Sequence, residues 1–333
     1  MTTISATSIL ASKHAITGDR IDTLLLRYPR WIHAEGRTHR LMKIGEGVEI
    51  LVPTPSLMED ENLSRNASSS RAIPVEKLIQ DVLDDPAVPL FWGANQKGMQ
   101  ADEECDSTVL IAEGDDDLNG EPLVMDRDEA WHAAMEDAVE WAKRFSSAGY
   151  HKQIVNRLLE PFSHITVVAT ATNWSNFLAL RDHPDAEPHI QMLAAEIRTA
   201  LDDAIVQELQ PGEWHLPFVT SEDWRCFPQD LVVGGDGYSH DEAIDSLMKV
   251  SAARCASASY KTVDGFDMTI ERAVALVDKL IGSTPLHASP FEHVAQADRI
   301  SEIRGWREYE HHKQHGNFTG FRQWRKMLPN ECQ

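Results

Sequence analysis

SRNASSSRAIP occupies residues 64–74 of the sequence, and RYPRWIHAEGRTHR precedes it at residues 27–40. Small hydroxyl side chains beside an arginine can offer backbone N–H groups, hydroxyls and a bidentate guanidinium to a phosphate. The earlier segment holds four arginines against one glutamate, although the chain as a whole is strongly acidic. Together the two segments predict a site for an anionic ligand.

The rest of the chain is acidic and has the composition of a globular protein. It has 333 residues, a net charge of −22, 42% hydrophobic residues and 25% charged residues. These values exclude a collagen-like, low-complexity or wholly disordered chain, and the length allows one large domain or two ordinary ones. A protein that coats duplex DNA is disfavoured, because binding the phosphate backbone needs a basic surface.

Half of the net charge comes from residues 101–129, which hold twelve acidic residues and one arginine. We interpret this stretch as a solvated acidic loop. Metal binding by Asp115, Asp116 and Asp117 is the minor alternative, because neither their spacing nor a glycine matches a calcium-binding loop.

The sequence shows no sign of export or of a membrane span. The N-terminal residues lack a basic start and an unbroken apolar core, and no apolar run approaches the roughly 18 residues that a span requires. Cys105, Cys226, Cys255 and Cys332 lie far apart with no CxxC pair, which predicts reduced thiols. We therefore expect a cytoplasmic protein with neither a membrane nor a nucleic acid as partner.

Hydrophobic patterning predicts strands early in the chain and helices later, which is an α+β mixture. Alternation over residues 4–28, broken by Thr17-Gly18-Asp19, predicts a β-hairpin. Residues 41–63 contain glycines and prolines and predict a loop or small hairpin. Helical spacing predicts six helices: over 131–145, over 151–159, beginning near Asn173, over 185–209, over 241–254 and over 269–281. Gly149 is expected to form the C-cap of the first helix, and Ile205 is expected on the apolar face of the fourth.

Several ordered motifs resemble the flavin-dependent thymidylate synthases. THR at 38–40 followed by SRNASSSRAIP is similar to the family's bipartite signature, in the variant common among its bacteriophage members. The resemblance extends over QIVNRLLEP (153–161), TNWSNFLALRDHPDAEPHI (172–190) and GEWHLPFV (212–219). SAARCASASYK (251–261) and SPFEHV (289–294) resemble segments that normally open the family's chain, so their late position implies a circular permutation of one catalytic domain spanning 1–333.

The resemblance assigns expected roles to individual residues. His39 and Arg40 match residues that hold the flavin, and Asn176 matches a flavin-contacting asparagine. His293 matches a histidine near the folate and flavin rings, and Arg181 matches the arginine that reads the pyrimidine ring. The expected nucleotide-binding residues are Glu35, Ser69, Ser70, Arg71, Arg157 and Arg181, and Arg181 and His293 are the expected catalytic residues.

The family resemblance also implies a fold and an activity. The implied fold is a mainly antiparallel sheet flanked by helices, assembled as a homotetramer with shared sites. The implied reaction converts dUMP to dTMP with FAD as cofactor, methylenetetrahydrofolate as one-carbon donor and NADPH as reductant. Two alternatives stay open: a pyrimidine-nucleotide hydroxymethylase for phage DNA modification, and a catalytically silent flavin- or nucleotide-binding homologue.

The sequence departs from the family's pattern at a few points. Thr38, Ala67 and Ala72 replace an arginine, a glutamate and a tyrosine of the usual signature, and residues 41–63 form an insertion between its two halves. Such an insertion is compatible with activity if it forms a surface hairpin, because lengthening a loop costs little entropy.

Other conspicuous residues have structural interpretations. His311, His312 and His315 could place two imidazoles four residues apart, but a solvated polar segment is favoured over a metal site because no HExxH motif is present. Trp131 and Trp141 are expected in the core, and Cys226 and Cys255 are expected to be small buried residues. No glycine-rich dinucleotide loop or P-loop occurs.

Overall fold

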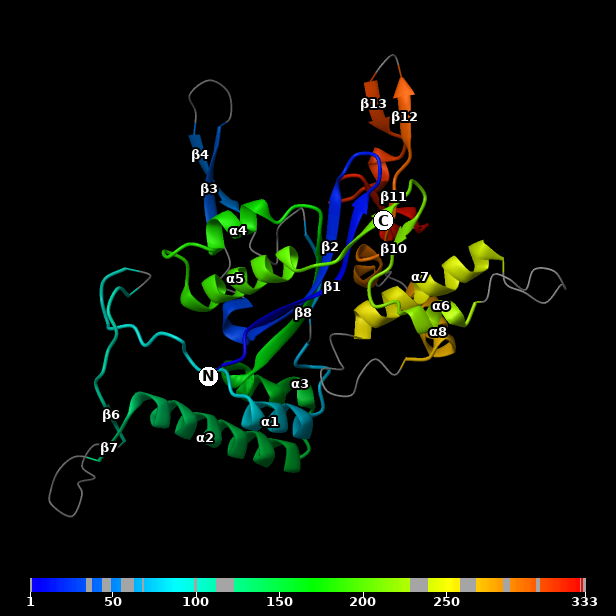
Figure 1. The fold of residues 1–333 in the computed structure, drawn as a ribbon. Helices are drawn as coiled ribbons and strands as arrows, with labels where there is room; N and C mark the ends of the chain where they lie inside the picture. Colours follow the sequence, from blue (N-terminus) through cyan, green and yellow to red (C-terminus); the bar gives the residue numbers. More distant parts are fainter. Residues whose placement is uncertain are drawn as a thin grey trace.

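The computed structural model describes residues 2–33, 38–43, 49–54, 63–67, 69–98, 101–111, 123–227, 239–257, 268–283, 288–303, 306–329 and 331. Figure 1 shows a central sheet with helices on both sides of it.

The central sheet has five strands in the order β5-β8-β2-β1-β9. These are β1 (Ser5–His14), β2 (Arg20–Pro29), β5 (Leu63–Ala67), β8 (His164–Ala171) and β9 (Val206–Leu209). All neighbours are antiparallel except β1 and β9, which are parallel. The β1–β2 hairpin turns through Gly18, whose φ of 79° suits a glycine. The α+β class and the hairpin are therefore confirmed, and the sheet is mainly antiparallel.

The two faces of the sheet have different partners, because alternate residues of a strand point to opposite faces. One face packs on α4 (Ser175–Arg181) and α5 (Pro188–Asp202) in an apolar core that includes Leu24, Leu26, Val167, Ala169, Leu193 and Ile197. On the other face, Leu25 and Val168 pack near Cys255 of α7 (His240–Ser257). That second face also carries the buried hydroxyls of Thr23 and Thr170, which pair directly across β2 and β8.

A second helical layer consists of α1 (Val75–Asp84), α2 (Arg127–Ser147) and α3 (Lys152–Val155). Its apolar core includes Leu78, Val82, Met135, Val139, Ala142 and Leu159. Helix α2 ends just before Gly149, which has a φ of 87°, so the predicted helix and its end are confirmed. The predicted burial of Trp141 is wrong, because this side chain is 53% exposed and lies beside the Arg144 guanidinium.

Two predicted helices end earlier than the sequence pattern indicated. The 151–159 segment forms α3 only to Val155 and then continues as 3₁₀ helices Asn156–Leu158 and Glu160–Phe162. The 185–209 helix ends at Asp202, and β9 follows. Ile205, predicted on an apolar helix face, is 94% exposed. Backbone pairing with β1 satisfies residues 206–209, so an extended strand replaces the last turns of the predicted helix.

The C-terminal part supplies the helices on the second side of the sheet. Helices α6 (Ser221–Arg225), α7 and α8 (Ile270–Ile281) pack with the 3₁₀ helix Ser289–Glu292 and the 3₁₀ helix Trp324–Met327. A three-stranded sheet joins β10 (Trp214–His215), β11 (Ala295–Ala297) and β14 (Phe321–Gln323), and β12 (Ile300–Ile303) pairs with β13 (Trp306–Tyr309). The helices predicted over 241–254 and 269–281 are confirmed. The prediction that Cys226 is buried is wrong, because it is exposed after α6.

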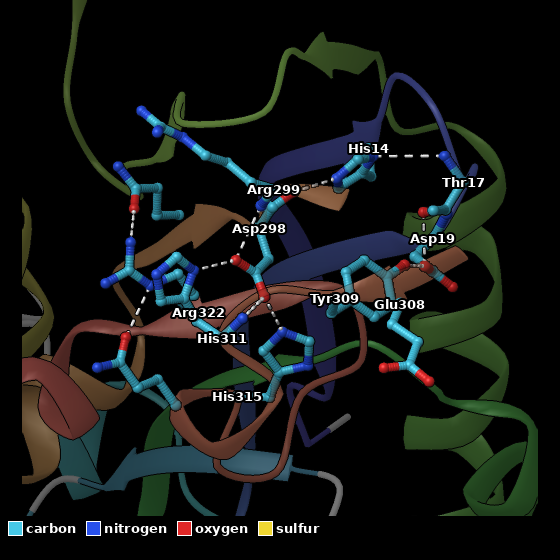
Figure 2. Close-up of polar contacts among 12 residues, drawn as sticks. His14, Thr17, Asp19, Asp298, Arg299, Glu308, Tyr309, His311, His315 and Arg322 are labelled. Atoms are coloured by element: carbon cyan, nitrogen blue, oxygen red, sulfur yellow. Dashed lines mark hydrogen bonds and ion pairs between the residues drawn. The ribbon is translucent and has the colours of Figure 1, made fainter. Parts of the chain in front are cut away.

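Buried Asp298 ties this C-terminal part to the β1–β2 hairpin (Figure 2). Its carboxylate accepts hydrogen bonds from the rings of His311 (2.8 Å) and His315 (2.9 Å), and its backbone carbonyl lies 2.8 Å from Nε2 of His14. Tyr309 donates its hydroxyl proton to Asp19 in the hairpin turn. The prediction of a solvated histidine segment is therefore wrong for His315, which is buried against Asp298.

The structure describes part of the 41–63 insertion and part of the acidic stretch 101–129. Residues 41–63 contribute to a hairpin of β3 (Thr38–Lys43) and β4 (Glu49–Thr54), which agrees with the predicted loop or small hairpin. Residues 101–129 include the short pair β6 (Val109–Leu110) and β7 (Val124–Met125), whereas the Asp115-Asp116-Asp117 run lies outside the described residues. No helix within the described ranges is long and apolar enough to cross a membrane.

Candidate functional site

The serine-rich turn that follows β5 is held by side chains from the segment after α2. The amide of Asn156 donates to the backbone carbonyls of Ser70 (2.6 Å) and Ile73 (2.9 Å), and Lys152 donates to the carbonyl of Ala72 (2.6 Å). Asn156 is completely buried, so its amide gains partners that water cannot supply there. The turn is therefore built into the fold rather than left as a free loop.

Glu160 joins this turn to the predicted phosphate-binding arginine. Ser70 donates its hydroxyl proton to Oε1 of Glu160 (2.5 Å), and Arg157 donates to both carboxylate oxygens of Glu160 (2.9 and 3.1 Å). Ser70 is buried, whereas the Arg157 side chain is 57% exposed. Two predicted nucleotide-binding residues, far apart in the sequence, thus meet at one carboxylate.

Arg30 adds a further cation to this cluster, which we call the Glu160 cluster: Arg30, Ser70, Arg157 and Glu160. The Nε of Arg30 donates to the hydroxyl of Ser163 (3.2 Å), which lies on the segment that leads from Glu160 into β8. Burial lowers the pKa of Arg30, while the charge of Glu160 opposes that shift and the charge of Arg157 adds to it. In this cluster Arg157 contacts the Glu160 carboxylate directly, and Arg30 lies near enough for its charge to interact with both.

Sequence reasoning identified only part of this cluster. Ser70 and Arg157 were among the predicted residues, but Glu160 and Arg30 were not. The available signals were the three-residue spacing of Arg157 and Glu160 and the position of Arg30 in the basic segment 27–40. The predicted Ser69 and Arg71 flank Ser70 in the same turn, half-buried and exposed respectively.

His293 lies at the other end of β5 and β8 from the Glu160 cluster. It is completely buried, and its Nδ1 is 2.9 Å from the hydroxyl of Thr170 near the end of β8. Its Nε2 is buried without a hydrogen-bond partner among the described residues. Burial lowers the pKa of His293 to about 3, so the ring is neutral near pH 7.

The structure brings the two motifs that contain Ser64 and His293 side by side. Strand β5 lies against the 3₁₀ helix Ser289–Glu292, and Gln323 of β14 donates both to the hydroxyl of Ser64 (3.0 Å) and to the carbonyl of Glu292 (3.3 Å). The SRNASSSRAIP and SPFEHV segments therefore pack against each other although about 220 residues separate them.

Asn176 and Arg181 lie on α4, which follows the Ala171 end of β8. Asn176 is exposed and Arg181 is half-buried, and burial lowers the pKa of the Arg181 guanidinium while Glu187 opposes that shift. The Glu160 cluster adjoins the His164 end of the strand, about 23 Å away along β8 at 3.3 Å per residue. Within one chain, the start of α4 and the Glu160 cluster are therefore at opposite ends of the strand, whereas Arg181, the last residue of α4, is near Glu187.

The remaining predicted site residues lie outside the described side chains. His39 and Arg40 belong to β3, whose side chains are outside the described part of the structure, and Glu35 lies outside the described residues altogether. No group of three or more potential metal ligands occurs among the described residues.

Comparison with solved structures finds distant similarities, which include one protein in two complexes. The UMP/dUMP methylase PolB from Streptomyces cacaoi bound with 5-Br dUMP is 14% identical, with a TM-score of 0.36, over 60% of this chain and 90% of that chain. The same methylase bound with 5-Br UMP is 15% identical, with a TM-score of 0.37, over 60% of this chain and 89% of that one. At this level of similarity neither activity nor ligand transfers to the present chain.

No protein-family model matches the sequence, and no curated protein matches it either.

Proposed function

We propose that this chain is a flavin-dependent thymidylate synthase that converts dUMP to dTMP. The observation that carries the proposal is the Glu160 cluster, in which the serine-rich turn and the QIVNRLLEP segment meet around Ser70 and Arg157. These are the segments whose resemblance to that family implies phosphate binding. The proposal includes a single circularly permuted catalytic domain and a cytoplasmic location.

The Glu160 cluster would hold the phosphate of dUMP. Arg157 is exposed enough to rotate from Glu160 to a phosphate, and Arg71 next to Ser70 is exposed as well. The buried hydroxyl of Ser70 is aimed into the cluster, so it can donate to a phosphate oxygen in place of Glu160. Charge-assisted contacts of this kind are about twice as strong as neutral hydrogen bonds.

His293, Asn176, His39 and Arg40 would hold FAD, and Arg181 would polarise the pyrimidine carbonyls. The described residues fit a carbonyl-bearing ring at His293, because the buried Nε2 of this side chain has no partner among them. A bound, reduced flavin supplies the hydride that completes the methyl group, methylenetetrahydrofolate supplies the carbon, and NADPH reduces the flavin. The chain's own contribution is positioning and electrostatic stabilisation.

The chain does not need a protein thiolate in this reaction. Burial raises the pKa of the Cys255 thiol, so it stays protonated and behaves as a small apolar side chain.

A homotetramer would explain the placement of α4. Asn176, in the first turn of α4, lies near the Ala171 end of β8 and opposite to the Glu160 cluster, so α4 of one subunit could complete the site of another. Sites shared between subunits are part of the proposal.

Turnover and absorbance test the proposed activity directly. The purified protein, loaded with FAD, is expected to convert dUMP to dTMP in the presence of methylenetetrahydrofolate and NADPH. Chromatography separates dTMP from a hydroxymethylated nucleotide, which is the product of the alternative enzyme. A protein that cannot be loaded with FAD, as judged by its visible absorbance, contradicts the proposal.

Arg157→Ala tests the phosphate site. We expect the dissociation constant of dUMP to rise by at least about tenfold, because a charge-assisted hydrogen bond contributes about 1.5–3 kcal/mol. The flavin absorbance should not change. Arg144→Ala is the matched control, since Arg144 forms a similar exposed pair with Glu140 on α2. Unchanged dUMP affinity in Arg157→Ala would remove Arg157 from the site.

A further inference from the structure

A row of buried polar side chains crosses the central sheet and ends at His293. The row begins at Gln207 on β9, runs through Ser12 on β1 and Thr23 on β2 to Thr170 on β8, and is bridged between Ser12 and Thr23 by His215 of β10. All members except Gln207 are completely buried. We call this row the sheet relay: Gln207, Ser12, His215, Thr23, Thr170 and His293.

Each neighbouring pair in the sheet relay is within hydrogen-bond distance. Nε2 of Gln207 donates to Ser12 Oγ at 3.0 Å, and Ser12 Oγ lies 2.7 Å from Nδ1 of His215. Nε2 of His215 lies 2.9 Å from the Thr23 hydroxyl. The Thr23 and Thr170 hydroxyls are 2.7 Å apart, and Thr170 lies 2.9 Å from Nδ1 of His293.

The two histidines of the sheet relay are neutral near pH 7. Burial lowers the pKa of His293 to about 3, and burial together with the neighbouring His293 lowers the pKa of His215 to about 3. A neutral imidazole has one N–H and one acceptor nitrogen, and a hydroxyl has one proton to donate. Every bond in such a row therefore points in the same direction.

Gln207 determines that direction. Its amide donates to Ser12, whose hydroxyl has no partner besides Gln207 and His215 among the described residues. The Ser12 proton therefore goes to Nδ1 of His215, whose own proton is then on Nε2. Nε2 of His215 donates to Thr23, Thr23 donates to Thr170, and Thr170 donates to Nδ1 of His293. The remaining proton of His293 is on Nε2, which is the buried nitrogen without a partner among the described residues.

We propose that the sheet relay fixes the tautomer of His293, so that Nε2 is an N–H donor aimed at a carbonyl oxygen of a bound heterocyclic ring. Ser12, Thr23, Thr170, His215 and Gln207 are then positioning residues that act through His293. The identity of the ring as a flavin, pterin or pyrimidine rests on the proposed function, whereas the tautomer itself does not.

The relay can be reversed from its exposed end. Gln207 is exposed and lines a cavity of about 540 Å³ with Trp214 and Arg299, so a substitution there leaves the buried members in place. A carboxylate can only accept hydrogen bonds when ionised. In Gln207→Glu, Ser12 must therefore donate outward, and every later bond reverses, which moves the His293 proton from Nε2 to Nδ1.

Nitrogen-15 NMR of the ligand-free protein, labelled at histidine, measures this directly. In the native protein we expect protonated Nε2 and unprotonated Nδ1 for both His215 and His293, and in Gln207→Glu the opposite for both. Gln210→Glu, with the same change at another exposed glutamine nearby, should leave both tautomers unchanged. Thr170→Val should disconnect His293 while His215 keeps its native tautomer.

A native His293 protonated at Nδ1, or a tautomer that Gln207→Glu does not change, would overturn the proposal. These outcomes need neither flavin nor nucleotide, so they are distinct from a failure of the proposed activity. If the activity is present, Gln207→Glu should lower kcat at least about tenfold, because a ring carbonyl would then face a nitrogen lone pair.

Discussion

Glu160 places a negative charge within the residues proposed to hold the dUMP phosphate. Its carboxylate accepts from Ser70 and Arg157, so phosphate binding must displace it or tolerate its charge. Two unit charges 4 Å apart in water repel by about 1 kcal/mol. We therefore expect Glu160→Gln to lower the dissociation constant of dUMP about fivefold at low ionic strength, as measured by titration calorimetry.

Two comparisons separate charge from shape in this measurement. Deoxyuridine, which has no phosphate, should bind the native protein and Glu160→Gln equally well. The gain for dUMP should shrink at high salt, because exposed charges are screened. Glu140→Gln on α2 serves as the matched variant, and a weaker dUMP affinity in Glu160→Gln would show that the carboxylate orients Arg157 instead.

At the scale of elements, α6 and α7 are joined by a buried ion pair. Arg254 of α7 donates to both carboxylate oxygens of Asp223 in α6 (2.5 and 2.8 Å), and also to the carbonyl of Phe218 (2.6 Å). Burial acts to raise the pKa of Asp223, but hydrogen bonds from Arg254 and Thr220 outweigh it and hold that pKa below its usual value. The pair is therefore charged near pH 7.

Asp223→Ala is expected to lower the free energy of unfolding by about 3–5 kcal/mol, because it leaves the buried Arg254 guanidinium without its counter-charge. Urea denaturation followed by circular dichroism measures this loss. Glu222→Ala, on the exposed side of the same helix, should change stability by less than about 0.5 kcal/mol. Equal effects of the two substitutions would contradict a stabilising role for the ion pair.

For the whole molecule, the buried histidines predict how stability depends on pH. His215 and His293 have pKa values of about 3 when folded, whereas an exposed histidine titrates near 6.5. Below pH 6.5 the unfolded chain therefore binds protons that the folded protein does not, and stability falls as pH falls. Together the two residues should remove about 2 kcal/mol of unfolding free energy between pH 6.5 and 5.5.

The side chain of His164, whose pKa burial lowers to about 4, acts in the same direction. Urea denaturation of the native protein and of His215→Gln at the two pH values therefore isolates the share of His215. His215→Gln should remove about half of the two-histidine contribution, because one buried imidazole remains. An unchanged pH dependence in that variant would show that His215 is protonated to the same extent in both states.

Helices and strands of this molecule could be predicted from the sequence where residue spacing and glycines within the segment determine them. Alternation and Gly18 indicate the first hairpin, and helical spacing with a following glycine indicates α2 and α8. Local spacing could not end the 185–209 helix correctly, because the pairing of β9 with β1 depends on residues almost 200 positions away. For the same reason the segment around His315 looked solvated, although Asp298 covers it.

The candidate site likewise has a part that the sequence indicated and a part that only the tertiary structure showed. Residue type indicated an anion site, because hydroxyls beside guanidiniums can bind a phosphate. The resemblance of ordered motifs to a known family then assigned roles to Ser70, Arg157 and His293. Only the tertiary structure brought Glu160 between Ser70 and Arg157 and aligned Ser12, Thr23 and Thr170 in one row. A hydrogen-bond network depends on distances across strands, and strand pairing is a long-range property that one-dimensional spacing does not contain.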